Sequence, residues 1–205
     1  MSVLSDETLE NLQKSGELVI YPLLEITQIK GARVDIRLDN VFYLIKRIDV
    51  DSYDAMKLSH PGEKPINYLD KSTIPYGEAF VIHPGEFALA PSFEGFKIPG
   101  GLIGLLDGRS SLGRLGIIVH VTSGSVDPGF SGPLVLELAN LGRIPVKLFP
   151  MMRVASVKFL RLEGKVKRTY QSKDKYLGIK NLLYPLSRLH EDADLGTIER
   201  LSDYV

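Results

Sequence analysis

The chain has 205 residues, 44% of them hydrophobic, which suits one sizeable domain with a buried core and excludes general disorder. Its 25 basic and 25 acidic residues cancel, which argues against bulk binding to nucleic acid or to acidic membranes. The absence of cysteine excludes disulfides, thiolate nucleophiles and cysteine-bound zinc.

A short helix is expected at the N-terminus, within residues 1–16. Ser5 is a good N-cap, acidic residues fill the first turn, and Gly16 follows the last turn. Leu9 and Leu12 would then face the body of the protein. The first ten residues lack the apolar core of a signal peptide, and no apolar run is long enough to span a bilayer. We therefore expect a cytoplasmic protein.

Short strands dominate the sequence after this helix. Residues 33–39 alternate between polar and apolar, so Val34, Ile36 and Leu38 are expected to share a buried face. Proline and glycine turns separate further strands, which are predicted at residues 41–45, 79–83, 87–90, 102–106, 117–121, 134–139, 146–149 and 154–160. Such a series predicts an all-β domain of the barrel or jelly-roll type.

Two segments lack a regular pattern. Residues 51–75 are polar and are predicted to form a long loop. The segment from about residue 163 to residue 205 begins basic and polar without clear periodicity, and we expect it to be a mobile tail. A single domain would thus cover residues 1–205, with the helix and the tail included.

Glu137 is the most informative residue of the chain. It interrupts an apolar run, residues 134–139, that is otherwise typical of a buried strand. A carboxylate in apolar surroundings is costly unless it is paired or its environment is used chemically. One interpretation is a structural ion pair with an arginine, and the other is a general base tuned by its burial.

A polar segment upstream of this strand combines two arginines with two serines. Arg109 and Arg114 are suited to bind phosphate oxygens through their forked donors. Ser110 and Ser111 add hydroxyl groups, and the predicted turn adds backbone N–H groups. A hairpin turn with solvated arginines is an equally good interpretation of these residues alone.

Asp127 and the histidines carry weaker signals. Asp127 is suited to hold a sugar hydroxyl or a base edge, but Asp-Pro-Gly is more simply a turn. His120 follows an apolar run and is expected in the core or at an interface. The four histidines show no metal-ligand spacing, and no nucleophile elbow, Walker A motif or dinucleotide fingerprint is present. The residues alone suggest a site for a small anionic ligand.

Taken together, these segments resemble the dCTP deaminases of the trimeric dUTPase superfamily. Their order and spacing are far more specific than any single motif, and the similarity runs through most of the chain. It rests on residues 31–38, 85–90, 106–116, 119–122, 126–132 and 134–137.

The resemblance implies a fold and a reaction. The subunit would be a distorted jelly-roll of the β-clip type, assembled as a homotrimer with active sites at subunit interfaces and the C-terminal tail closing over the nucleotide. The reaction would be deamination of dCTP to dUTP and ammonia, in the supply of dUMP and dTTP precursors. Mg²⁺ would be held mainly by the substrate phosphates, with no metal bound by the protein and no zinc, which agrees with the absence of the cysteines of the zinc deaminase signature. The family also makes dTTP a candidate feedback inhibitor.

The resemblance assigns roles to individual residues. Glu137 would be the general base that activates water for attack on cytosine C4, with Ser110 and Arg114 positioning that water and stabilising charge. Phosphates would be held by Arg109 and Ser111, the deoxyribose by Asp127, and the base by the backbone near Val135. The full set of substrate contacts would be Arg109, Ser110, Ser111, Leu112, Gly113, Arg114, Asp127, Val135, Leu136, Glu137, Tyr170 and Lys175, with Lys173 as the alternative to Lys175.

Two departures from the family pattern leave the product open. Gly124 and Ser125 stand where monofunctional deaminases carry His-Arg, and residues 122–125 match only in part the Thr-Ala-Gly-aromatic pattern of the dUMP-forming members. In the tail, residues 178–180 lack the usual glutamine. The alternatives are therefore a bifunctional enzyme forming dUMP and pyrophosphate, a non-catalytic nucleotide-binding homologue and, ranked lower for want of a Gly-rich C-terminal segment, a dUTPase.

Overall fold

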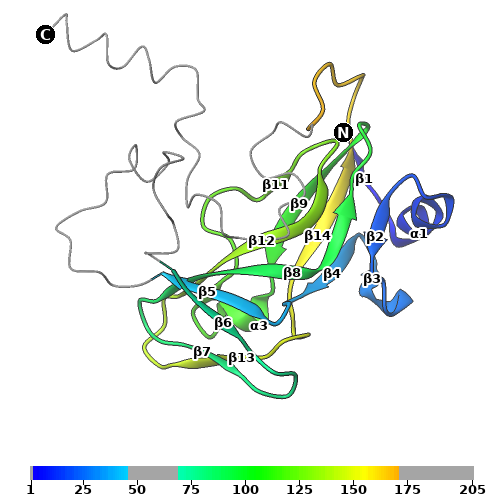
Figure 1. The fold of residues 1–205 in the computed structure, drawn as a ribbon. Coiled ribbons are helices and arrows are strands. Elements are labelled where there is room, and N and C mark those ends of the chain that lie inside the picture. Colours follow the sequence, from blue (N-terminus) through cyan, green and yellow to red (C-terminus); the bar gives the residue numbers. More distant parts are fainter. Residues whose placement is uncertain (1, 46–68, 171–205) are drawn as a thin grey trace, which may run out of the picture.

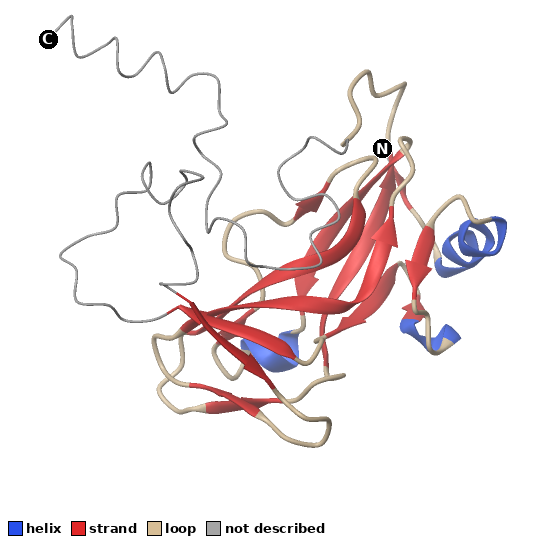
Figure 2. Cartoon of the chain, viewed as in Figure 1, coloured by secondary structure: helices blue, strands red, loops and turns tan. Residues whose placement is uncertain are grey.

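The computed structural model describes residues 2–45 and 69–170, which form two main antiparallel sheets and a small third one (Figure 1, Figure 2). The strand order of the first sheet is β11-β9-β14-β4-β3, with β1 beside β14. That of the second is β10-β12-β8-β5-β6, with β2 beside β8, and β13 pairs with β7 in the third. The all-β fold class predicted from the sequence is confirmed.

The first sheet consists of β1 (Ser2–Val3), β3 (Ile29–Lys30), β4 (Arg33–Arg37), β9 (Leu102–Gly108), β11 (Ser125–Val126) and β14 (Arg153–Arg161). The second consists of β2 (Val19–Tyr21), β5 (Val41–Ile45), β6 (Leu69–Thr73), β8 (Phe87–Lys97), β10 (Ile117–Ile118) and β12 (Ser131–Asn140). The third contains β7 (Phe80–Ile82) and β13 (Val146–Leu148). The helical segments described are α1 (Asp6–Ser15), η1 (Ile26–Gln28) and α3 (Ser110–Gly113).

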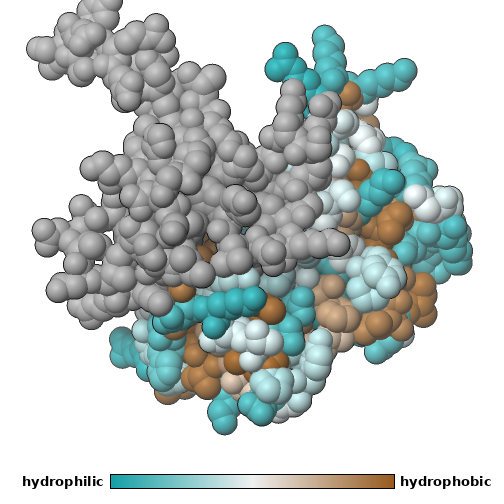
Figure 3. All heavy atoms as spheres, viewed as in Figure 1, coloured by the Kyte–Doolittle hydropathy of each residue, from teal (hydrophilic) through white to brown (hydrophobic). Residues whose placement is uncertain are grey.

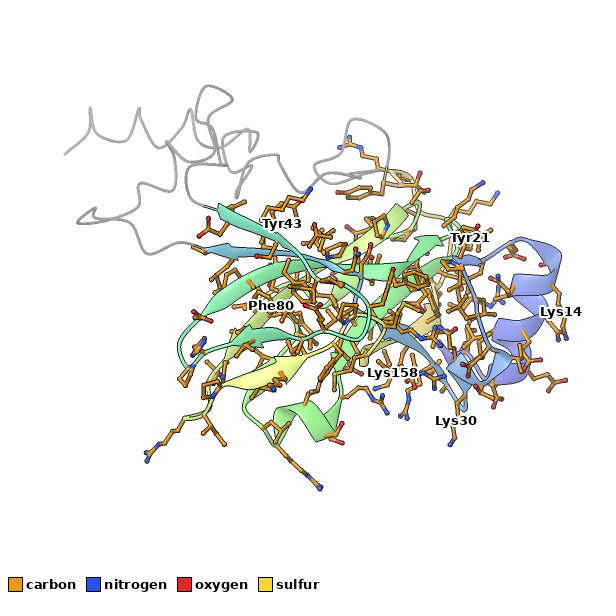
Figure 4. All side chains as sticks on the ribbon, turned by 60° about the horizontal axis from the view of Figure 1, so that its bottom comes forward. Lys14, Tyr21, Lys30, Tyr43, Phe80 and Lys158 are labelled. Carbon is orange, nitrogen blue, oxygen red and sulfur yellow. The ribbon has the colours of Figure 1, made fainter. Side chains whose placement is uncertain are left out.

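One hydrophobic cluster joins the sheets. Ile36 of β4 and Phe159 of β14 meet Phe42 of β5 and Leu136 of β12 in a core where all four are completely buried. Phe80, labelled in Figure 4, stacks on Phe42 with ring centroids 4.3 Å apart. Full burial of such a side chain stabilises the fold by about 1.5–3 kcal/mol. The core therefore fixes the two sheets that carry the candidate site.

Helix α1 has the caps that its sequence predicts. The Ser5 side chain accepts a hydrogen bond from the backbone of Thr8, and Gly16 ends the helix in the left-handed conformation at φ 74°. Leu9 and Leu12 are buried against the sheets, as expected. None of the helices in the described part of the chain is long and apolar enough to cross a membrane.

Three predicted boundaries are wrong. Residues 69–73 of the predicted loop form β6, which pairs with β5, while residues 46–68 lie outside the described part of the chain. Strand β8 continues through Pro91 to Lys97, because a break in the β8–β12 register beside Pro91 tolerates the missing backbone N–H. Strand β10 ends at Ile118, where a bend at Val119 interrupts the extended backbone.

A buried polar network was not anticipated from the sequence. Val34, Ile36 and Leu38 are completely buried as predicted, but Asp35 and Arg37 between them are buried as well. The network centres on Glu94, which is inaccessible to solvent and accepts hydrogen bonds from Gln28 Nε2 at 2.9 Å, Arg37 Nη1 at 2.8 Å and Arg37 N at 2.8 Å. Alternation identifies a strand face, but only packing of β4 on β8 decides that both faces are covered.

Candidate active site

Glu137 lies on β12 and is partly buried. Its Oε2 accepts hydrogen bonds from the backbone N–H of Val121 at 2.7 Å and of Thr122 at 3.4 Å. Its own backbone N–H donates to the carbonyl of Val119 at 3.0 Å. No cation of the described residues forms an ion pair with it, so the interpretation as a structural ion pair finds no partner there. Oε1 is left for other chemistry.

Residues 119–124, whose backbone binds Glu137, cross from the second sheet to the first. At their far end, Leu106 of β9 donates its backbone N–H to the carbonyl of Gly124 at 2.6 Å, and β11 then pairs with β9. A methyl group on Gly124 would lie 3.3 Å from the Leu106 carbonyl oxygen and 3.4 Å from His120 Cε1. The segment therefore fits closely between the sheets, and a residue with a side chain would crowd it.

On the side of β12 that faces β10, no described strand pairs with Val135, two residues before Glu137. Strand β10 covers this edge only opposite residues 139 and 140, and its continuation reaches Glu137. Residues two apart on a strand direct their backbone groups to the same edge, so Val135 presents its N–H and C=O there, as Glu137 does. Leu136 points its backbone to β8 and its side chain is completely buried. The edge thus offers one donor and one acceptor beside a carboxylate.

The segment predicted as a turn between β9 and β10 is the short helix α3. The Arg109 carbonyl accepts from the N–H groups of Leu112 and Gly113, and the buried Leu112 anchors the helix. Ser110, Ser111, Gly113 and Arg114 are exposed. Arg109 Nη1 donates to the Arg153 carbonyl at 3.2 Å, which orients this guanidinium. Among the described residues, neither Arg109 nor Arg114, which flank α3, forms an ion pair, so both have donors left for a ligand.

Asp127 lies exposed in a turn just before β12. Its carbonyl accepts from Phe130 N at 3.1 Å and Gly129 has φ 91°, so the turn interpretation is right, yet its side chain has no hydrogen-bond partner within the described residues. Tyr170 docks on this turn: its N–H donates to the Pro128 carbonyl at 2.7 Å, and its ring lies 5.8 Å from that of Phe130. Lys175 and Lys173 lie outside the described part of the chain.

The candidate residues thus form two halves within one chain. One half contains Glu137, the open edge of β12, the Asp127 turn and Tyr170. The other is α3 with its arginines and serines. In the described residues no hydrogen bond or ion pair joins Glu137 to Ser110 or Arg114. The amides of Val121 and Thr122 were not anticipated as part of the first half, because backbone donors leave no trace in residue type.

His120 adds one unexplained feature to the first half. It is partly buried, in line with the expected core or interface histidine, and its Nδ1 is buried without a hydrogen-bond partner in the described residues. Within those residues, no group of three or more His, Asp or Glu side chains is arranged to hold a metal ion.

A second basic feature lies on the outer face of the first sheet. A hollow of about 290 Å³ is lined by Lys30, Gly31, Ala32, Arg33 and Lys158, and Figure 4 shows Lys30 and Lys158 on the same side of the molecule. Arg33 lies 3.5 Å from Asp35, and Lys158 pairs with Asp107. Because carboxylates already neutralise two of its cations, this hollow is a poorer anion site than α3.

Comparison with known proteins decides the family. A family model described as dCTP deaminase-like matches residues 3–162. The chain belongs to this family. The matched range contains β12, the Asp127 turn and α3, whereas Tyr170 and Lys175 follow it.

Relatives within the dCTP deaminase-like family differ in their stated product. A "dCTP deaminase, dUMP-forming" of Methanobrevibacter smithii is 43% identical over 162 residues, 78% of this chain and 80% of the relative. A "dCTP deaminase" of Haemophilus influenzae is 39% identical over 198 residues, 93% of this chain and 99% of the relative. The crystal structure of 2′-deoxycytidine 5′-triphosphate deaminase from Agrobacterium tumefaciens matches with a TM-score of 0.59 at 22% identity, over 77% of this chain and 47% of that one. This chain spans about half of that chain, and the likeness concerns the fold alone.

Proposed function

We propose that the protein deaminates dCTP hydrolytically to dUTP and ammonia, without zinc. The observation that carries the proposal is the geometry of Glu137: two backbone amides hold Oε2, which leaves Oε1 free beside an open strand edge. A carboxylate fixed through one oxygen is oriented to take a proton with the other. The names of the relatives in Methanobrevibacter smithii and Haemophilus influenzae support the substrate.

The reaction needs one water and returns one ammonia. Glu137 takes a proton from the water as its oxygen attacks C4 of cytosine, and it then passes that proton to the amino nitrogen that leaves. The Ser110 hydroxyl positions the water, and the Arg114 guanidinium stabilises the charge that develops at the reacting centre. The bond from C4 to the amino nitrogen breaks, the second proton of the water ends on ring nitrogen N3, and a carbonyl remains at C4.

The remaining contacts follow from the donors and acceptors present. The Val135 N–H and C=O match the alternating donors and acceptors on the edge of a pyrimidine. The free carboxylate of Asp127 accepts from the deoxyribose hydroxyl, and Tyr170 covers the same end of the site. Arg109 and Ser111 hold the triphosphate, and Lys175 of the tail completes this contact.

Mg²⁺ enters this scheme with the nucleotide. The α3 segment offers guanidinium and hydroxyl groups, a donor set that fits phosphate oxygens rather than a bare cation. The cation would offset the charge of the triphosphate while Arg109 and Ser111 hold the phosphate oxygens that it leaves free.

Assembly as a homotrimer brings α3 of one subunit to Glu137 of another. Exposed apolar side chains support an interface: Tyr21, Leu24 and Ile26 are 76%, 51% and 54% exposed, and Figure 3 shows apolar surface beside α1. Within the described residues no hydrogen bond or ion pair joins Glu137 to Ser110 or Arg114, which also supports a shared site. dTTP, which presents the same sugar and triphosphate, would compete for it.

Gly124 favours a second candidate, the bifunctional reaction that continues to dUMP and pyrophosphate. A side chain at Gly124 would crowd the Leu106 carbonyl oxygen at 3.3 Å and the His120 ring at 3.4 Å, which disfavours the histidine of monofunctional deaminases there. Residues 122–125 match the dUMP-forming pattern at Thr122 and Gly124, with Ser123 in place of alanine and Ser125 in place of the aromatic residue. A non-catalytic homologue and a dUTPase are the remaining alternatives. In both, Glu137 would have no role in deamination.

The decisive test incubates the purified protein with dCTP and Mg²⁺, measures ammonia and separates the nucleotides. Ammonia with dUTP supports the first proposal, and ammonia with dUMP and pyrophosphate supports the second. If nucleotide binds and no ammonia appears, deamination is excluded, and hydrolysis of added dUTP then separates a dUTPase from a binding protein.

A further inference from the structure

Asn140 ends β12, three residues after Glu137, and its side chain is completely buried. Its Nδ2 donates to the carbonyls of Ile82 at 3.0 Å and Ile144 at 2.9 Å, and its Oδ1 accepts from Gly142 N at 2.8 Å. Two donors and one acceptor are thus matched to three backbone partners, and only an amide fits all of them. The residue fixes the chain that leaves β12.

That chain touches the end of α3 through two glycines. Leu141 donates its N–H to the Gly116 carbonyl at 2.8 Å. A methyl group on Gly116, at φ 83°, would lie 2.5 Å from Gly142 N, and one on Gly142 would lie 2.8 Å from the Leu115 carbonyl oxygen. Such distances mean that backbone lies directly on backbone, so a displacement of Gly142 must move residues 115 and 116.

Residues 115 and 116 are in turn bound to α3. Leu115 donates to the carbonyl of Leu112 at 2.9 Å and Gly116 to that of Gly113 at 3.0 Å. Arg114 lies between these bonded residues. A continuous series of contacts therefore runs from the Asn140 side chain through Gly142 and Gly116 to the helix that carries Ser110 and Arg114.

We propose that Asn140 is a positioning residue for deamination, which sets helix α3 relative to Glu137 on the same subunit. The inference rests on the proposed function. In a closed symmetric assembly, the spacing of the two halves on each subunit decides how they meet across every interface. An error of about 1 Å in that spacing is enough to lower a rate roughly a hundredfold.

The main variant is Asn140→Asp. It keeps the size of the side chain but replaces two donors with an oxygen that faces the carbonyls of Ile82 and Ile144. We expect turnover of dCTP to fall about tenfold or more, with a smaller change in KM. Amide hydrogen exchange should become faster in residues 110–116, and this readout does not depend on any activity.

Two glycines supply a matched comparison. Gly116→Ala and Gly16→Ala both place a side chain at positive φ, but only the first meets a neighbour, since nothing lies within 4 Å of the position at Gly16. Gly116→Ala should reproduce the loss of turnover and the local exchange, while Gly16→Ala should change neither. The double variant of Asn140→Asp with Gly116→Ala should lose little more turnover than the more impaired of the two single variants.

The outcomes separate the two proposals. If the wild-type protein releases no ammonia, the proposed function fails, and exchange in residues 110–116 still decides whether Asn140 holds α3. Wild-type turnover in folded Asn140→Asp, or equal losses in Gly16→Ala and Gly116→Ala, would overturn the inference. If Asn140→Asp does not fold, Gly116→Ala and Gly142→Ala provide the same two readouts, and wild-type values in both would overturn it equally.

Discussion

Two backbone amides decide what Glu137 is able to do. The N–H groups of Val121 and Thr122 occupy Oε2, and in the described residues no arginine or lysine neutralises the carboxylate. The side chain is thereby oriented without a permanent counter-charge. A structural ion pair would instead have engaged the carboxylate with a cation. The absence of such a pair is what a general base needs and what a purely structural carboxylate does not.

Glu137→Gln should abolish ammonia release while nucleotide binding stays within about tenfold. The amide keeps the shape and still accepts from Val121, but it takes up no proton, and general base catalysis contributes roughly 10²–10⁴-fold. Steady-state ammonia release and dCTP titration measure the two effects. Glu86→Gln is the control, since Glu86 also accepts from a backbone amide, that of His83 at 2.6 Å, outside the site. Equal losses of affinity and rate in Glu137→Gln would contradict the role of base.

Arg114→Ala should lower both affinity and turnover, with a combined loss of roughly ten- to a hundredfold in kcat/KM, because a hydrogen bond to a charged group contributes about 1.5–3 kcal/mol. Stability should change by less than about 0.5 kcal/mol, since the side chain is exposed and has no ion-pair partner among the described residues. Arg161→Ala, an exposed arginine at the end of β14, controls for loss of one charge. Full activity in Arg114→Ala would contradict the assignment of Arg114 to the site.

At the scale of elements, β4 and β8 meet through charges rather than through apolar side chains alone. Arg37 of β4 and Glu94 of β8 form a buried pair at 2.8 Å, and Gln28 satisfies the same carboxylate. Arg153 of β14 continues the network towards Glu25 at 3.2 Å, and its carbonyl orients Arg109. The first sheet thus connects a buried ion pair to the candidate phosphate site.

Glu94→Ala should lower the free energy of unfolding by about 3–5 kcal/mol, because the buried Arg37 would lose its partner. In a protein of this size that corresponds to a fall of roughly 6–20 °C in melting temperature. Thermal unfolding at fixed protein concentration measures it. Glu10→Ala, which removes the surface pair with Lys14 on α1, should cost less than about 0.5 kcal/mol. Similar changes in melting temperature for the two variants would show that the buried pair stabilises the fold no more than the surface pair.

At the scale of the whole molecule, the lack of a direct bond between Glu137 and α3 in the described residues bears on how a complete site is formed. Each chain carries both halves, but within the described residues no hydrogen bond or ion pair joins Glu137 to α3. The proposed homotrimer would join them, because a ring of identical copies forms one complete site at every interface.

Mixing two impaired variants tests the shared site. When Glu137→Gln and Arg114→Ala subunits assemble at random in equal amounts, about a quarter of the interfaces combine an intact Arg114 with an intact Glu137, and selecting assemblies that contain both variants raises this share. Co-expression with two tags, tandem purification and an ammonia assay should therefore give activity well above that of either parent. Mixed assemblies no more active than the better parent would place both halves of the site in a single chain.

Prediction from the sequence succeeded where local chemistry decides the outcome. The caps of α1, the buried face of Val34, Ile36 and Leu38, and the turn at Asp127 follow from residue type and spacing. Prediction was wrong for residues 69–73 and for the continuation of β8 through Pro91. Both are polar or proline-containing strands whose pairing depends on neighbours far along the chain.

The fold class, the family and the residue types of the candidate site were all accessible from the order of amino acids. Those features depend on periodicity and on motifs in a fixed order, which are local properties of the chain. Three further features arise only in the folded molecule: two amides hold Oε2 of Glu137, the edge at Val135 is open, and Asn140 is linked to α3. These features depend on backbone groups brought together by strand order, and a backbone group is the same in every residue other than proline.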